Sequence, residues 1–424
     1  MKNKTLAFLL AISCTLSATA CGATGDKEAS VSRADEARAE LADEFDEDQE
    51  DEDEEEVELR EAEDEEGSSG KAATAPGELS DDLYDFQISI DGTVYRLPMW
   101  YSDFEAFGWE FEGDSTETLT SGNHAFYEKW SKDGVEITTR LSNLSMNTIS
   151  LSESIVTEIT LSSYNLRDCG WEIILPGGIQ WGVSGIDDII AAYGDPDSDY
   201  DSSGYYSMTY ELDSYKVINL GISKEEDALM EIDIINVEEL EGLDNSVNEA
   251  VPDLVKEYQA PTSMDDDLYT CTAQLEGVVY SLPCPVSVFL ENGFTIDTVN
   301  SDETVASGKT GWISLQYNNQ TLGTMVQNYA DYATTIENCF VTSLTTTIYG
   351  PNLEMVFPRN IKVGDSEEVL KKAVDGFNCE VMSVDVNTFY QIYDPEKSML
   401  DGYSFIVQDG IIVSIQVQNY TKPE

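Results

Sequence analysis

Alternating apolar and polar residues mark the first predicted element near residue 86. Phe86, Ile88 and Ile90 alternate with polar residues, Asp91-Gly92 follows, and a second apolar-rich run covers residues 94–97. Period-two alternation is typical of a strand with one buried face, and Asp-Gly favours a two-residue turn. The pattern therefore predicts a β-hairpin.

Two short helices and a group of strands are predicted after this hairpin. Ser102 begins a Ser-x-x-Glu capping box, and Gly108 follows the first helix. The second helix is predicted to start near Ser184 and to stop at Gly194. Residues 135–162 between them are rich in Thr, Ser, Ile and Leu, a composition that favours strands.

The same pattern returns at an offset of 185, from Asp81 to Asp266. The first copy begins DDLYDFQISIDGTVYRLPMWYSDFEAFGW and the second begins DDLYTCTAQLEGVVYSLPCPVSVFLENGF. Three residues are later lost, so Pro176 matches Pro358 at an offset of 182, and near the ends Ile232 and Ile234 match Ile415 and Val417 at an offset of 183. This period is too long for a solenoid and predicts two tandem copies of one domain.

The predicted fold is α+β, because each copy combines several antiparallel strands with two short helices. A disordered acidic linker precedes the two copies. We call residues 81–238 segment one and residues 265–424 segment two. The other predicted parts are a signal peptide (1–20), a lipidated cysteine with the acidic linker (21–80), and a linker between the segments (239–264).

The N-terminus has the pattern of a signal peptide. Lys2 and Lys4 precede an apolar stretch from Leu6 to about Leu16, which is too short to span a bilayer. The small residues 18–20 form a cleavage site directly before a Cys-Gly pair.

This signal peptide with its Cys-Gly pair resembles the lipobox of bacterial lipoproteins. The resemblance implies a diacylglyceryl thioether on Cys21 with palmitate-type acyl chains, and an anchor on the outer face of the bacterial cell membrane. Ala18 departs from the family pattern, where Leu is commoner. Ordinary secretion with a free Cys21 is the alternative.

Charge limits the possible functions. Residues 26–66 contain 23 acidic and 4 basic side chains, and such a segment cannot bury enough apolar surface to fold. We expect a disordered spacer, with a cation-binding or partner-binding tail as the alternative.

The whole chain has 83 acidic and 22 basic residues, a net charge of -61 that argues against nucleic-acid binding. His124 is the only histidine and is expected in a turn or on the surface.

The sequence GIQWGVSGIDDIIAAYGDP, which begins at Gly178, resembles a motif of secreted lipoproteins of Gram-positive bacteria. It is also similar to the signature of small envelope proteins with the outer-membrane-assembly lipoprotein and β-lactamase-inhibitor-like fold. Segment two departs from it at residues 374–376. The resemblance covers about 20 residues of each segment and implies protein-binding or envelope roles without catalysis; it implies no particular site residues.

A series of alternate aspartates is a candidate calcium site. Asp195, Asp197, Asp199 and Asp201 are predicted to lie in a loop, and alternate oxygen ligands are typical of EF-hand loops. The turn glycine and the glutamate at position twelve of such a loop are missing, so a solvated acidic loop is the favoured interpretation. Calcium is the only candidate cofactor.

Aromatic residues that segment two lacks are the candidates for ligand contact. Trp100, Tyr101 and Phe107 correspond to Pro285, Val286 and Asn292, so we do not expect the fold to need them. Aromatic side chains of this kind can anchor proteins or stack on sugars.

Five cysteines remain after the predicted processing, and none forms a C-x-x-C motif. Free, buried thiols are expected, with a Cys271–Cys284 disulfide as the open alternative. The five are Cys169, Cys271, Cys284, Cys339 and Cys379.

These features predict a non-catalytic binding module for an extracellular protein or glycan. An envelope-maintenance lipoprotein, chaperone-like or inhibitor-like, is the alternative, and a secreted hydrolase is the third class. The hydrolase lacks any pattern of nucleophile and base.

Overall fold

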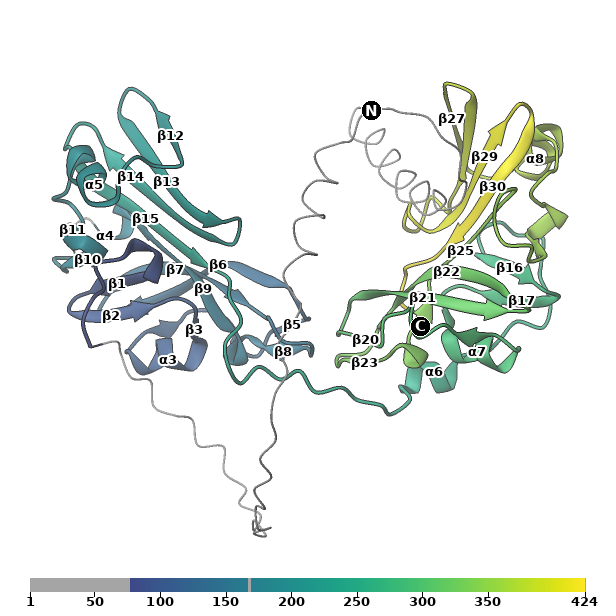
Figure 1. Ribbon diagram of the computed structural model, residues 1–424, viewed down its shortest axis with the longest axis horizontal. Helices are drawn as coiled ribbons and strands as arrows, with labels where there is room; N and C mark the ends of the chain where they lie inside the picture. The colour runs from purple at the N-terminus through teal and green to yellow at the C-terminus, as the bar shows by residue number, and fades with distance from the viewer. Residues whose placement is uncertain (1–76, 167–168, 424) are drawn as a thin grey trace, which may run out of the picture. The chain divides into compact units, whose positions relative to one another are not determined.

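The structure is a computed structural model that describes residues 77–166 and 169–423 (Figure 1). The predicted signal peptide, Cys21 and most of the acidic linker lie outside the described residues. The described chain consists mainly of antiparallel sheets with a few short helices, as an α+β or mainly-β protein does. No helix within these two ranges is long and apolar enough to cross a membrane.

Segment one begins with a small sheet that contains the predicted hairpin. Asp91 and Gly92 form its turn with φ angles of 47° and 75°, and Ile90 pairs with Thr93 across it. A two-residue turn with two positive φ angles matches the twist of the strands that it joins, so the prediction is confirmed. The sheet order is β11-β10-β1-β2, with β1 (Gln87–Ile90), β2 (Thr93–Arg96), β10 (Ile173–Leu175) and β11 (Ile179–Gln180).

A large antiparallel sheet forms the rest of segment one. Its order is β12-β13-β14-β15-β9-β7-β6-β4, and β3 also pairs with β9. One face is apolar and packs on the core, while the other face is largely polar. The strands are β3 (Met99–Trp100), β4 (Glu110–Phe111), β6 (His124–Lys132), β7 (Val135–Ser142), β9 (Ile155–Ser162), β12 (Ser198–Asp201), β13 (Tyr205–Asp213), β14 (Lys216–Ser223) and β15 (Ala228–Asn236).

The helices of segment one begin differently from the prediction. Trp100 is the N-cap of α3 (Tyr101–Ala106), so the predicted capping box at Ser102 is wrong and Ser102 lies inside the helix. Helix α5 (Ile186–Tyr193) starts close to the predicted position and ends at Gly194, whose φ is 82°. The remaining short elements are β5 (Thr118–Leu119), β8 (Ile149–Ser150), α4 (Ser163–Leu166), η2 (Leu83–Asp85), η3 (Leu151–Glu153) and η4 (Pro176–Gly178).

Segment two contains sheets with the orders β17-β16-β26, β18-β24-β22-β21-β19 and β25-β30-β29-β28-β27. The strands of the first two sheets are β16 (Thr272–Leu275), β17 (Val278–Ser281), β18 (Cys284–Pro285), β19 (Thr295–Ile296), β21 (Thr310–Tyr317), β22 (Gln320–Gln327), β24 (Phe340–Val341) and β26 (Met355–Val356). Those of the third are β25 (Ser343–Thr347), β27 (Cys379–Val384), β28 (Asn387–Ile392), β29 (Gly402–Gln408) and β30 (Ile411–Gln418). Its shorter elements are α7 (Val286–Glu291), α8 (Glu367–Ala373), β20 (Thr304–Val305), β23 (Thr334–Thr335), η5 (Ile336–Asn338) and η6 (Pro358–Asn360), and α6 (Asp253–Glu257) lies in the stretch between the segments.

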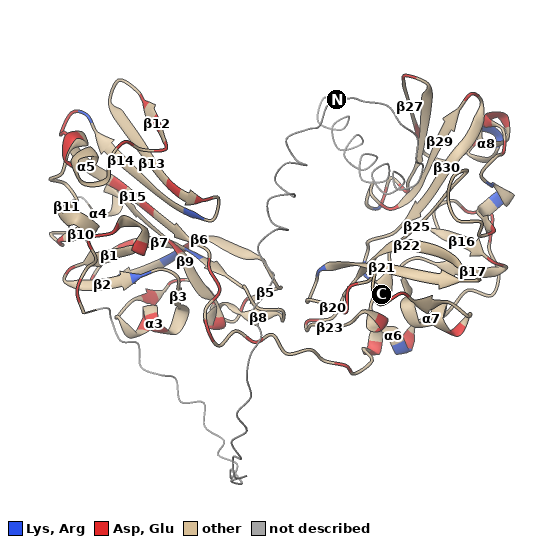
Figure 2. Ribbon diagram, in the orientation of Figure 1, with Lys and Arg blue, Asp and Glu red and all other residues tan. Residues whose placement is uncertain are grey.

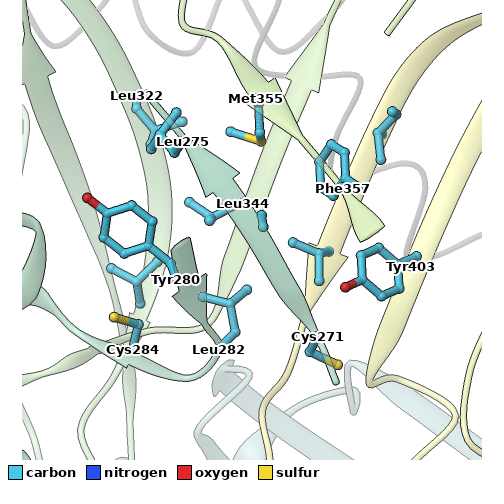
Figure 3. Packing of buried hydrophobic residues seen from close by; sticks show 14 of the residues in the cluster. Cys271, Leu275, Tyr280, Leu282, Cys284, Leu322, Leu344, Met355, Phe357 and Tyr403 are labelled. Atoms are coloured by element: carbon cyan, nitrogen blue, oxygen red, sulfur yellow. The ribbon is translucent and has the colours of Figure 1, made fainter. Parts of the chain in front are cut away.

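Buried apolar side chains form two separate clusters, one in each segment. Figure 3 shows part of the cluster of segment two, with Cys284 beside Tyr280 and Cys271 near Tyr403. All five cysteines of the described chain are free, and three of them are buried, as predicted. Burial raises the pKa of the Cys271 and Cys284 thiols to about 12, which keeps both protonated.

Corresponding side-chain hydrogen bonds recur in the two segments. Thr157 Oγ1 donates to the carbonyl of Arg140, and Thr342 Oγ1 donates to the carbonyl of Met325. The amides of two buried asparagines at the sequence offset of 183 make a second matching pair: Asn236 donates to Leu97 and Asn419 to Leu282, both at 2.8 Å. These bonds allow positions in the two segments to be compared one by one.

Candidate functional site

The aromatic contact candidates do not form one exposed surface. Tyr101 is only 2 % exposed and packs against Trp130, with ring centroids 4.7 Å apart, so its prediction as a contact residue is wrong. Its counterpart Val286 is fully buried as well. The difference between the segments at this position is therefore a difference in how the core is filled.

Trp100 and Phe107 are half-buried. Phe107 packs edge-on against the buried Tyr95 at 5.2 Å, and its carbonyl accepts a hydrogen bond from Lys132 Nζ at 2.8 Å. Both contacts hold Phe107 against the fold. The three aromatic residues therefore share a neighbourhood in the sequence but do not present a common surface.

The predicted acidic loop is in large part an edge strand. Asp199 and Asp201 lie in β12, and Asp197 directly precedes it. Alternate side chains in a strand are about 7 Å apart along the chain, so they do not converge on one ion. Asp197 Oδ2 instead accepts the backbone N–H of Glu211 at 2.8 Å, and Asp201 is ion-paired with Lys224. Within residues 77–166 and 169–423, no group of three or more His, Cys, Asp or Glu side chains could hold a metal; this geometry does not favour the calcium site.

His124 is the first residue of β6 and is half-buried, so the turn, one of its two expected places, is wrong. Its Nδ1 is 2.7 Å from Ser142 Oγ, and Ser142 Oγ is 2.5 Å from Thr157 Oγ1. Burial, followed by the charge of Arg140, lowers the pKa of His124. The His–Ser pair has the spacing of a base and a nucleophile, but the Ser142 side chain is fully buried, so a substrate has no access to it.

The structure assembles a different set of residues on the outer face of the large sheet. Arg140 lies opposite Glu158 across the β7–β9 pair, and Asp233 lies opposite Thr160 across the β15–β9 pair. Alternate residues of a strand point to the same face, so these side chains lie on the side away from the core. We call this set the polar row; its members are Arg140, Glu158, Thr160, Thr209, Asn219 and Asp233.

Hydrogen bonds connect the polar row from strand to strand. Thr209 Oγ1 donates to Asn219 Oδ1 at 2.9 Å, and Asn219 Nδ2 donates to Asp233 Oδ2 at 3.2 Å. Thr160 Oγ1 donates to the other oxygen of Asp233 at 3.0 Å. Each oxygen of the Asp233 carboxyl therefore accepts a hydrogen bond from a neutral neighbour.

The charged end of the polar row is formed by Arg140 and Glu158. Nε of Arg140 is 3.2 Å from Oε2 of Glu158, and the two side chains are 14 % and 16 % exposed. The guanidinium also lies over the ring of Phe126, 5.7 Å from its centroid. Nη2 of Arg140 is buried without a hydrogen-bond partner within the described residues. Nε, although it is ion-paired with Glu158, also makes no hydrogen bond among the described residues, and buried donors without a partner cost free energy.

Two carboxyl groups of the polar row have perturbed pKa values. Burial, followed by the charge of Asp233, raises the pKa of Glu158 to about 7. Burial also raises the pKa of Asp233, which opposes the effect of its hydrogen bonds from Asn219 and Thr160. The two carboxyls titrate as a pair, so the sheet face gains negative charge as the pH rises through neutrality.

Segment two keeps the strand pairing around the position of Asp233 but not its charge. Gln416 lies opposite Thr345 and Ser404, as Asp233 lies opposite Thr160 and Asn219. The matching carbonyl bonds place Met325 at the position of Arg140, and Ser343 follows Thr342 as Glu158 follows Thr157. All three charged members of the polar row are therefore neutral in segment two.

The polar row was missed in the sequence because its charged members are far apart along the chain, from residue 140 to residue 233. Only strand pairing brings them together. The available signal was the comparison of the copies at offsets of 185 and 183, which aligns a charged residue with a neutral one at each of these positions.

Comparisons with known proteins add no assignment: no protein-family model, curated protein or solved structure matches the chain.

Proposed function

We propose that this chain is a non-catalytic binding protein, built from two tandem copies of one α+β domain and anchored through a lipid on Cys21 to the outer face of the bacterial cell membrane. The polar row of segment one contacts an extracellular protein or glycan. The signal-peptide pattern and the Cys-Gly pair support the anchor. The matching hydrogen bonds and the two separate cores support the duplication.

One observation carries the binding role: the charged members of the polar row are replaced by Met325, Ser343 and Gln416 in segment two. A partly buried ion pair pays a desolvation cost and is weak support for stability. Gln416 pairs with Thr345 and Ser404 without a charge, so the strand pairing at the position of Asp233 does not require one. A half-buried face of hydrogen-bond donors and acceptors suits a polar ligand.

An envelope-maintenance lipoprotein is the second candidate. The resemblance of the segment that begins at Gly178 to small envelope proteins favours it. The two candidates separate on deletion of the gene: loss of envelope integrity without a retained ligand favours maintenance. Turnover of an ester, peptide or glycoside would instead favour the hydrolase.

The binding role is tested with a variant in which the charged residues of the polar row are replaced by their counterparts from segment two. The chain from residue 21 with Cys21→Ser is immobilised and exposed to cell-envelope and culture extracts. The test variant adds Arg140→Met, Glu158→Ser and Asp233→Gln, which are the residues of segment two. A ligand retained by the first protein and lost by the variant supports the proposal. Equal retention by both proteins removes the polar row from the binding surface.

The anchor is tested separately with the full-length precursor. Wild-type protein should enter the membrane fraction and incorporate a clickable fatty acid. Cys21→Ser should abolish both, while Cys14→Ser, which changes another cysteine of the signal peptide, should leave both unchanged. Membrane association of Cys21→Ser without label would contradict a lipid anchor at this residue.

A further inference from the structure

The large sheet of segment one and the third sheet of segment two end in corresponding edge strands. Among the described residues, β12 pairs only with β13, and β27 pairs only with β28. Gln391 of β28 lies opposite Ser404, as Thr209 of β13 lies opposite Asn219. The next residues along these two strands are Met208 and Tyr390. Asp199 lies opposite Met208, and Val381 lies opposite Tyr390. Val381 therefore occupies the position of Asp199.

The two edges differ in charge. The residues Asp197, Asp199 and Asp201 correspond to Cys379, Val381 and Ser383 by this register. Exposed charges protect a sheet edge from pairing with another strand. β12 carries that protection, whereas Val381 of β27 is 56 % exposed on an uncharged side of its strand. Figure 2 shows red segments on β12, while β27 is mostly tan.

A groove runs beside β27 in segment two. Its volume is about 560 Å³, and the apolar or neutral residues that line it include Val374, Phe377, Cys379, Val381, Thr388 and Tyr390. Asp201 of segment one lies opposite Tyr206, and its counterpart Ser383 lies opposite Thr388. Tyr206 therefore occupies the position of Thr388. Segment one therefore has a larger side chain at the corresponding position, and Asp199 accepts a hydrogen bond from it.

We propose that β27 binds an extended segment of a basic partner protein by β-strand addition, with alternate apolar side chains of that segment entering the groove. A strand at an edge directs the N–H and C=O groups of alternate residues outward, where an added strand can pair with them. β27 has six residues, which is the length of an ordinary strand. This surface is separate from the polar row and does not depend on it.

Charge decides between a basic partner and a second copy of this chain. Lys371 is the cation that lines the groove, and Glu367 neutralises it at 2.9 Å. Asp375 also lines the groove, and Glu380 and Asp385 lie on and beside β27. A second copy would bring the same carboxylates and a net charge of -61 to the pairing edge, which opposes association. A segment with lysine beside valine and threonine complements the edge.

The experiment uses the chain from residue 21 with Cys21→Ser and the synthetic peptide Ac-KVTVKVT-NH2. We expect the peptide to bind in a calorimetric titration and to slow hydrogen exchange of the backbone amides of residues 379–384. The same peptide with N-methylated alternate residues cannot pair through its main chain and should not bind. The peptide Ac-EVTVEVT-NH2 should bind at least about tenfold more weakly, because its charges are repelled.

A matched variant places the charges of segment one on segment two. Val381→Asp with Ser383→Asp copies Asp199 and Asp201 and should weaken peptide binding by at least about tenfold. Val299→Asp, at a loop residue that is 89 % exposed, adds a charge elsewhere and should bind as the parent does. Equal melting temperatures of the three proteins show that folding is retained.

Three results would overturn the proposal. They are the absence of peptide binding and of amide protection at millimolar peptide, unchanged affinity in the Asp variant, and equal binding of the N-methylated peptide. Protection of residues 379–384 that rises with protein concentration alone, together with a dimer mass, would assign the edge to a second copy and contradict the basic partner.

Discussion

The two segments use corresponding strands for different surfaces. In segment one, β9 is continuous and joins β7 and β15 into one sheet, whereas segment two divides the same stretch into β24 and β25 in separate sheets. Segment one carries Arg140, Glu158 and Asp233 on the sheet face and aspartates at the edge. Segment two has neutral residues on the face and an apolar residue at the edge. Because Gln416 keeps the strand pairing of Asp233 without its charge, the charged face of segment one is a candidate for function.

This comparison separates two kinds of difference. Tyr101 and Val286 differ in size, but both are buried, so that difference belongs to the packing of each core. Glu158 and Ser343 differ in charge on a sheet face. A change of size inside a core alters stability first, whereas a change of charge on a face alters binding, solubility or pH dependence first.

The largest effect is expected from truncation of the core residue Tyr101. Tyr101→Ala should reduce the free energy of unfolding of segment one by about 3–5 kcal/mol, because it removes a buried aromatic ring. Urea unfolding followed by tryptophan fluorescence measures this loss. Retained stability with lost ligand binding would instead restore Tyr101 as a contact residue.

A smaller loss is expected from Arg140→Met alone. This change leaves Glu158 and Asp233 beside each other without their cation, so we expect a loss of up to about 3 kcal/mol. The triple variant with the residues of segment two should be more stable than the single variant at pH 8. Chemical unfolding of both proteins measures the difference, and a triple variant that is less stable than Arg140→Met would show that the charges serve the fold.

The pH dependence of stability gives a third comparison. Folding raises the pKa of Glu158 from 4.5 to about 7, so the folded state binds this proton more tightly than the unfolded state. The contribution is fully present below pH 4.5 and is lost as the pH rises through about 7. The melting temperature should therefore fall by a few degrees between pH 5.5 and pH 8, and Glu158→Gln should flatten this part of the curve. An equal slope in both proteins would contradict the assignment.

The smallest effect is expected at the edge of segment one. Lys224→Ala removes the ion pair with Asp201, in which the lysine side chain is 28 % exposed and the aspartate 63 %. Exposed pairs contribute at most about 1 kcal/mol, so we expect a loss below that value. Thermal unfolding at low and moderate salt measures it. A loss of several degrees that disappears with salt would show that β12 depends on this charge.

Local features of the fold were predictable, and long-range features were not. The turn at Asp91-Gly92 and the end of α5 at Gly194 depend on neighbouring residues, so the sequence indicates them directly. The capping box at Ser102 had the right spacing, but the β3 strand ends at Trp100 and the helix begins one residue before Ser102. Spacing alone does not place the first residue of a helix.

The candidate site also depends on long-range features that the sequence does not indicate. Tyr101 was assigned to the surface because its counterpart is smaller, yet both positions are buried, and a sequence comparison does not register how each core is filled. The loop predicted for Asp195, Asp197, Asp199 and Asp201 is in part a strand, because Ser198–Asp201 pairs with β13. The polar row depends on strand order across five strands, which no local pattern specifies.

The most direct test of the account compares ligand retention by the parent protein and by the variant with Arg140→Met, Glu158→Ser and Asp233→Gln, with the melting temperatures of both measured on the same samples. We expect the variant to fold cooperatively and to lose the ligand that the parent retains from envelope or culture extracts. A folded variant that retains the same ligand at the same level, or a variant that fails to fold, would contradict the claim that these charges serve binding.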